Sequence, residues 1–207
     1  TGVWALKDYD LSELRKYIDW TPFFSSWQLA GKYPEILKDP IVGHEAKKLF
    51  DDAQAMLDKI IAGKWIVANA VVGLFPACSD MDDVIIFAPL APKSPKGDLK
   101  ETLPIAPVLR PADAHPSATA QQPGDLLMRV HHLRQQVEKA PGQPNYCLSD
   151  FVAPVESGKQ DYIGGFAVTA GLEIEDKVKE FEAVHDDYHA ILLKALADRF
   201  AEAFAER

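Results

Sequence analysis

Residues 17–27 of this 207-residue chain read Tyr17-Ile18-Asp19-Trp20-Thr21-Pro22-Phe23-Phe24-Ser25-Ser26-Trp27. One carboxylate, Asp19, therefore stands among five aromatic rings and close to a proline that restricts the backbone. A carboxylate is rarely found among apolar rings unless a cation or hydrogen-bond donors offset its desolvation. Two interpretations follow from the spacing alone. Asp19 binds a cationic ligand, or it is a helix-end or turn carboxylate that accepts local N–H groups.

Apolar residues recur at helical spacing in three parts of the chain. A first helix begins after Asp10, a suitable N-cap, and leads into the aromatic stretch. A longer helix has an apolar stripe over residues 46–61 and ends at Gly63. A last helix is predicted from near Glu173 to the end of the chain, as a principal core element. Its apolar stripe comprises Val178, Phe181, Val184, Tyr188, Ile191, Leu192, Ala195, Leu196, Phe200 and Phe204.

Segments rich in β-branched and aromatic residues predict four strands. They cover residues 70–76, 84–87, 126–130 and 162–169. The first two flank an Asp-rich turn at residues 80–83, which predicts an antiparallel pair. In the last strand, the Gly164-Gly165 pair indicates a bulge or a close backbone approach. Without a regular βαβ alternation, we expect a single α+β domain with a mostly antiparallel twisted sheet flanked by helices.

Residues 89–125 differ from the rest of the chain because they are rich in proline and poor in large apolar residues. Eight of the fifteen prolines fall there: Pro89, Pro92, Pro95, Pro104, Pro107, Pro111, Pro116 and Pro123. Such a segment buries too little surface to fold alone, and its prolines oppose regular hydrogen bonding. We therefore predict a surface loop that forms no core element.

Composition limits the classes of partner. A formal net charge of −9 argues against nucleic acid as the main partner, which needs clustered cations. The longest apolar runs, such as residues 68–78, are too short to span a membrane, and we expect a cytoplasmic protein. The two cysteines, Cys78 and Cys147, form no CxxC motif, so we expect free, partly buried thiols rather than a disulfide or a thiolate metal site.

Six further sequence blocks follow the aromatic stretch in order across nearly the whole chain. They are Lys32-Tyr33-Pro34, Val72-Gly73-Leu74-Phe75-Pro76-Ala77, His132-Leu133-Arg134-Gln135-Gln136, Asp150-Phe151-Val152-Ala153-Pro154, Asp161-Tyr162-Ile163-Gly164-Gly165-Phe166-Ala167-Val168-Thr169 and His185-Asp186-Asp187-Tyr188. Together with residues 17–27, these blocks closely resemble the activation domain of cobalamin-dependent methionine synthase. In this comparison the proline-rich segment is an insertion relative to shorter family members.

The resemblance implies a reactivation module of the vitamin B12-dependent enzyme 5-methyltetrahydrofolate–homocysteine methyltransferase. In that family the module closes over the cobalamin-binding module of the same polypeptide when cobalamin has been oxidised. An electron from flavodoxin or a related flavoprotein reductase, coupled to methyl transfer from S-adenosylmethionine, converts cob(II)alamin to methylcobalamin. The module contributes chiefly positioning. Folate, homocysteine and zinc belong to other modules, so no complete turnover is expected of this fragment.

The chemistry of S-adenosylmethionine indicates what its site requires. Its sulfonium and ammonium groups favour nearby carboxylates, and its flat adenine favours aromatic walls. Asp19 with Trp20, Phe23 and Phe24 fits these needs, and neither a P-loop nor a dinucleotide-binding glycine motif is present. The resemblance implies that Asp19 and Glu202 contact the ligand. The residues alone place Glu202 on a solvated helix face.

The resemblance also implies ligand contacts from an Arg-x-x-x-Gly-Tyr-Pro segment that would follow Arg207. We therefore expect residues 1–207 to be a truncated activation domain that binds S-adenosylmethionine poorly or not at all. An alternative is a domain that has lost ligand binding and only docks the flavoprotein or the cobalamin module.

A second alternative is a helix-based metallohydrolase. It rests on His185 and His189 at a spacing of four, with Glu206 as a third ligand. Two points oppose it. An aspartate replaces the glutamate of the metalloprotease motif, and a continuous helix carries Glu206 about 25 Å away. We expect neither a metal site nor catalytic side chains of the Ser-His-Asp or Cys-His type.

Overall fold

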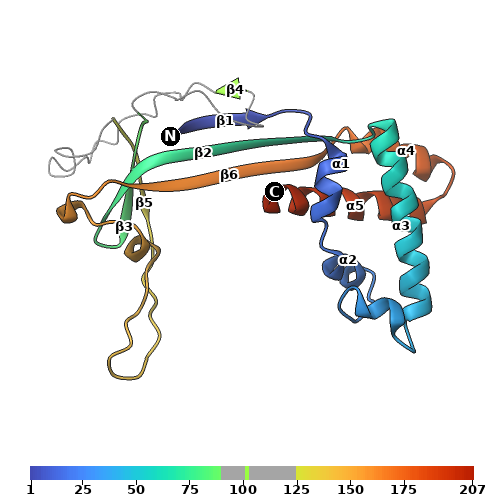
Figure 1. Cartoon of the computed structure of the whole chain (residues 1–207), viewed down its shortest axis with the longest axis horizontal. Helices are drawn as coiled ribbons and strands as arrows, with labels where there is room; N and C mark the ends of the chain where they lie inside the picture. Colours follow the sequence, from blue (N-terminus) through green and yellow to red (C-terminus); the bar gives the residue numbers. More distant parts are fainter. Residues whose placement is uncertain (90–100, 103–124) are drawn as a thin grey trace. The chain divides into compact units, whose positions relative to one another are not determined.

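The structure is a computed structural model that describes residues 1–89, 101–102 and 125–207 (Figure 1). It divides into two compact units. Unit 1 comprises Thr1–Ala5 and Val71–Phe166, and unit 2 comprises Leu6–Ala70 and Ala167–Arg207. Two long neighbouring strands, β2 (Val67–Asp80) and β6 (Asp161–Leu172), continue from one unit into the other.

The sheet contains six described strands in the order β4-β1-β2-β3-β5, with β6 paired to β2. The pairs β1–β4, β2–β3 and β3–β5 are antiparallel. The other strands are β1 (Gly2–Leu6), β3 (Asp83–Phe87), β4 (Glu101–Thr102) and β5 (Leu126–His131), and two 3-10 helices follow β5, η4 (Leu148–Phe151) and η5 (Val155–Ser157). With the helices of unit 2, this sheet confirms the predicted α+β class.

The hairpin of β2 and β3 confirms the antiparallel pair that the Asp-rich turn predicted. Its register runs from Ala77 opposite Ile86 to Asp80 opposite Asp83. Met81 lies in the turn with a φ of 55°, in the left-handed region. Cys78, on β2, is fully buried, and it is a free thiol as predicted, as is Cys147.

The Gly164-Gly165 pair lies in β6 without the close approach that the sequence indicated. A Cβ atom at Gly164 would stand 3.7 Å from the carbonyl oxygen of Gly73, an ordinary van der Waals distance. A Cβ atom at Gly165 would meet no described atom within 4 Å. The prediction of close approach is therefore wrong, because both positions have room for a side chain.

Unit 2 contains the helices, whose bounds follow in chain order. They are α1 (Leu11–Leu14), η1 (Arg15–Tyr17), α2 (Trp20–Ser26), η2 (Glu35–Lys38), α3 (Gly43–Gly63), α4 (Ile174–Ala183) and α5 (Asp187–Glu206). Asp10 caps α1, as predicted. The predicted end of α3 is also confirmed: Lys64 takes the left-handed conformation, and a Cβ atom at Gly63 would come within 2.3 Å of Trp65 Nε1. None of the described helices is long and apolar enough to cross a membrane.

The predicted last helix is two helices. The chain breaks at Val184 and His185, where His185 has a φ of 58°, and Asp186 then caps α5 by accepting the backbone N–H of His189. The apolar stripe is correspondingly interrupted, because Val184 and Ile191 are exposed. Tyr188 is also exposed and Phe181 is only half-buried, so the core prediction is confirmed for only part of the stripe. Its fully buried members are Leu192, Leu196 and Phe200.

Most of the proline-rich segment lies outside the described residues, namely 90–100 and 103–124, so the surface-loop prediction stays a prediction there. The exception is β4, whose Glu101 and Thr102 pair with Ala5 and Trp4 of β1. The expectation of no regular structure is wrong for these two residues. Neither is a proline, so both can take part in the backbone hydrogen bonds of a short strand at a sheet edge.

Candidate functional site

Asp19 caps the N-terminus of α2. Its Oδ1 atom accepts the backbone N–H of Thr21 at 2.9 Å, and its backbone is extended, with φ −79° and ψ 117°. This geometry confirms the interpretation of Asp19 as a local helix-end carboxylate. The side chain is also exposed. Because a carboxylate has about four lone-pair positions, one capping bond leaves it able to bind a cation.

The aromatic residues around Asp19 form a core rather than a ligand-binding wall. Trp20, Phe23 and Phe24 are all buried. The Trp20 ring meets Phe50 of α3 edge to face, with centroids 4.8 Å apart, and it meets Phe23 at 5.3 Å. The expectation that these three rings line the ligand is therefore wrong. They bury the apolar face of a short helix that α3 covers.

Two long-range contacts hold the segment that carries Asp19. The guanidinium of Arg15 donates to Asp58 Oδ1 at 2.6 Å and to Gln54 Oε1 at 2.7 Å, which ties η1 to α3. After Asp19, the hydroxyl oxygen of Thr21 accepts the backbone N–H of Tyr33 at 3.2 Å. The segment that carries Asp19 is thus tied to other parts of unit 2 both before and after this residue.

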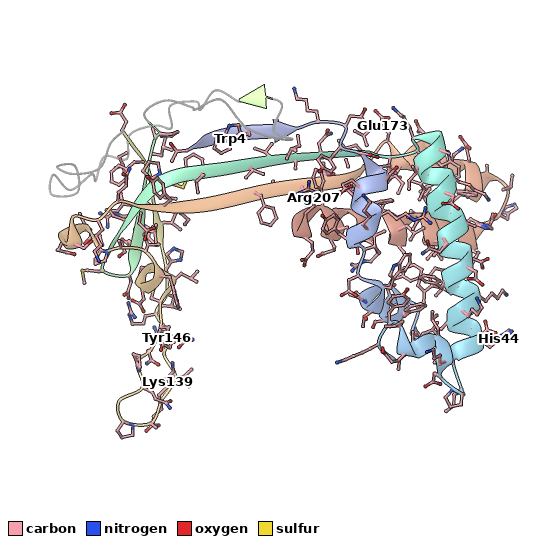
Figure 2. All side chains as sticks on the ribbon, viewed as in Figure 1. Trp4, His44, Lys139, Tyr146, Glu173 and Arg207 are labelled. Carbon is pink, nitrogen blue, oxygen red and sulfur yellow. The ribbon has the colours of Figure 1, made fainter. Side chains whose placement is uncertain are left out.

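An exposed aromatic ring lies near Asp19, and the pocket interpretation of the sequence did not use it. Tyr17 is exposed, and the Arg207 guanidinium stands over its ring at 5.9 Å from the centroid. Arg207 Nε also lies 3.8 Å from Glu13 Oε1. These contacts place the C-terminal end of α5 against α1 and η1 (Figure 2 labels Arg207). The position of Tyr17 in the sequence, two residues before Asp19, is the signal that could have indicated this ring.

Glu202 is exposed on α5, one turn before the C-terminal end of the helix. Its neighbours Phe200 and Ala203 are buried, so it belongs to the solvated face that the sequence predicted. Arg207 is five residues further on, about 7.5 Å along the helix axis. Arg207 in turn contacts Tyr17, two residues before Asp19.

The alternative metal motif is not formed. His185 lies outside both helices, so His185 and His189 do not share a helical face. The Nδ1 atom of His189 is bonded to the Asp186 carboxylate, at 2.7 Å from Oδ2. Nor does the described part of the chain hold three or more His, Cys, Asp or Glu residues grouped as a metal ion requires. These histidines belong to the junction of α4 and α5.

An open groove of about 520 Å³ lies in unit 2 at the other end of α2 from Asp19. It is lined by Ser26, Trp27, Gln28, Ile191, Lys194 and Ala195. Trp27 meets the Tyr188 ring edge to face at 5.5 Å, and the Tyr188 hydroxyl donates to Asp52 at 2.7 Å. Neither candidate carboxylate lines this groove.

The matching family model is that of the activation domain of vitamin B12-dependent methionine synthase, and the match covers residues 10–207. The chain therefore belongs to this family, as its motifs predicted.

Among solved structures, the chain is similar to the crystal structure of the MetH reactivation domain bound to AdoHcy. The sequence identity is 48% and the TM-score is 0.78. The similarity covers 99% of this chain and 53% of that one, so the chain spans about half the length of the solved domain.

Proposed function

We propose that this chain takes part in reactivating a vitamin B12-dependent methionine synthase, by binding S-adenosylmethionine and presenting its methyl group to cobalamin on a neighbouring module. One observation carries the proposal. A domain that is 48% identical over 99% of this chain has been solved with AdoHcy bound. AdoHcy is what remains of S-adenosylmethionine after the methyl group has left its sulfur, so that relative holds the product of a methyl transfer.

In this proposal Asp19 and Glu202 contact the cationic end of S-adenosylmethionine. Both carboxylates are exposed, and the contact of Tyr17 with Arg207 joins the segment just before Asp19 to the end of the helix that carries Glu202. Charge-assisted contacts of carboxylates with sulfonium and ammonium groups are stronger than neutral hydrogen bonds. The exposed Tyr17 ring, two residues before Asp19, offers a flat apolar surface.

Methyl transfer from the sulfonium breaks the sulfur–carbon bond and leaves the electron pair on sulfur, so the methyl acceptor must be a nucleophile. Cobalamin, when held by the neighbouring module, would supply that nucleophile as reduced cobalt. The electron would come from flavodoxin or a related flavoprotein reductase. This chain would bind and orient the methyl donor, a contribution of positioning and charge. We place the reaction in the cytoplasm.

The experiment uses the intact methionine synthase. Its affinity for S-adenosylmethionine and AdoHcy is measured by calorimetric titration, and methyl transfer to oxidised cobalamin is followed with a flavoprotein or a chemical reductant. We expect saturable binding and methylation with both reductants. A docking-only domain would bind neither compound, and methylation would not depend on S-adenosylmethionine. That result would overturn the proposal.

A further inference from the structure

The sequence block His185-Asp186-Asp187-Tyr188 spans the start of α5, and its last residue links three helices of unit 2. The Tyr188 hydroxyl donates to Asp52 Oδ2 of α3 at 2.7 Å. The Tyr188 ring meets Trp27, the C-cap of α2, edge to face with centroids 5.5 Å apart. Partial burial and the Asp52 carboxylate raise the pKa of the Tyr188 hydroxyl, so it stays protonated and donates. Tyr188 therefore ties the start of α5 to both α2 and α3.

The helix turn that carries Tyr188 is itself ordered by the residues around it. Asp186 accepts the backbone N–H of His189 at 3.2 Å, and its carboxylate is also bonded to His189 Nδ1 at 2.7 Å. The His189 ring stacks on Phe181 of α4, with centroids 5.6 Å apart. Because these contacts fix the first turn of α5, the Tyr188 side chain starts from a defined position.

The other end of α5 contacts the chain just before Asp19. There the Arg207 guanidinium stands over the Tyr17 ring, 5.9 Å from its centroid. Tyr188 and Arg207 are nineteen residues apart, about 28 Å along the helix axis. Both helical elements of residues 17–27, η1 and α2, pack against α5. With Tyr17 at one end of α5 and Trp27 at the other, residues 17–27 run along α5 in the opposite direction.

Each candidate carboxylate lies in a stretch of chain that these two contacts bound. Asp19 belongs to residues 17–27, and Glu202 belongs to residues 188–207 of α5 and its C-cap. A single contact leaves α5 free to pivot, whereas two contacts fix both its rotation and its position along the facing segment. Accurate placement matters, because a displacement of about 1 Å in a site can cost about a hundred-fold in rate.

We propose that Tyr188 is a positioning residue of the S-adenosylmethionine site, holding α5 against residues 17–27 so that Asp19 and Glu202 face one ligand. Tyr188 precedes Glu202 by fourteen residues, about 21 Å along α5, so it acts through the helix and not by touching the ligand's cationic end. The inference rests on the proposed function, which supplies the ligand that the two carboxylates bind.

The test is calorimetric titration of the intact methionine synthase and its variants with S-adenosylmethionine. Tyr188→Phe removes only the hydroxyl and Asp52→Ala removes its acceptor, so each should weaken binding about three- to tenfold. The double variant should bind no more weakly than either single variant, since both remove the same bond. Asp52→Asn keeps an acceptor oxygen and should restore the wild-type affinity. Asp51→Ala is the matched control and should bind like the wild type, because Asp51 pairs with Lys47 of its own helix.

Two further readouts separate positioning from stability. In the methylation assay, the KM for S-adenosylmethionine should rise in Tyr188→Phe while kcat stays at the wild-type value, because a bound ligand itself holds the two carboxylates together. Ile60→Ala truncates a fully buried side chain of α3. It should lower the melting temperature without changing the affinity.

The outcomes distinguish this inference from the proposed function. If the wild type binds S-adenosylmethionine and both Tyr188→Phe and Asp52→Ala bind it equally well, the positioning role alone is overturned. Affinity losses that follow the melting temperature across all variants, Ile60→Ala included, would also overturn it, since Tyr188 would then only stabilise the fold. A wild-type enzyme that binds no S-adenosylmethionine would overturn the proposed function and this inference with it.

Discussion

The Arg207 guanidinium lies 5.9 Å from the centre of the Tyr17 ring, so the end of α5 contacts the chain two residues before Asp19. Nearly the whole sequence separates these two residues. Their contact joins the segment just before Asp19 to the end of the helix that carries Glu202. Cation–π contacts at exposed sites contribute about 0.5–1 kcal/mol, enough to order a helix end.

Replacing the Tyr17 ring should loosen this contact. In Tyr17→Leu, backbone amides near the end of α5, from Ala203 to Arg207, should exchange with deuterium faster than in the wild type, because the cation loses its aromatic partner. Tyr17→Phe keeps the ring and is the matched control, with exchange at the wild-type rate. Equal protection in Tyr17→Leu and Tyr17→Phe would show that the ring does not hold the helix end.

The core side of α5 should be sensitive to truncation and its outer side should not. Leu192→Ala and Leu196→Ala each remove a fully buried side chain and should lower the free energy of unfolding by about 2–5 kcal/mol. Ile191→Ala, an exposed neighbour on the same helix, should change it by less than about 0.5 kcal/mol. Denaturant titration measures all three. Similar losses at Leu192 and Ile191 would contradict the observed burial.

The pairing of Asp150 with Arg134 predicts a pH dependence of stability. The hydrogen bonds from Arg134 and from the backbone N–H of Cys147 lower the pKa of the Asp150 carboxyl from 3.8 to about 2. A carboxyl whose pKa is depressed in the folded state stabilises the protein above its unfolded pKa, and the contribution is lost as the pH falls through the folded value.

The melting temperatures of wild type and Asp150→Asn should therefore differ by a constant amount above about pH 5. The difference should shrink as the pH falls from 3.8 toward about 2. Arg134→Gln removes the main cause of the shift, and in that background Asp150→Asn should have little pH-dependent effect. A difference that stays constant down to pH 2 would mean that the ion pair does not form in solution.

Local sequence signals predicted the elements whose ends are set locally. Asp10 caps α1, α3 ends at Gly63 beside Trp65, and the Asp-rich turn joins β2 to β3. In each case a cap, a steric requirement or a turn acts within a few residues. The motifs that identified the family were also sufficient, because they extend across the chain.

Helical periodicity did not predict the break between α4 and α5, because the apolar spacing continues through it. The stripe passes through Val184, yet the chain turns at His185 and restarts at Asp186. Asp186 was a usable signal, since aspartate is a favoured N-cap. The burial of Trp20 could not be predicted from neighbouring residues, because it depends on Phe50 of α3, thirty positions away.

The most direct measurement is the calorimetric affinity of the intact enzyme for S-adenosylmethionine in Asp19→Asn and Asp10→Asn. Both aspartates cap short helices with the same 2.9 Å bond, and asparagine caps equally well, so both variants should fold. Loss of a charge-assisted contact should weaken binding about ten- to a hundred-fold in Asp19→Asn. Asp10→Asn should bind like the wild type. Equal affinities in all three proteins would show that Asp19 is a capping residue and not part of the ligand site.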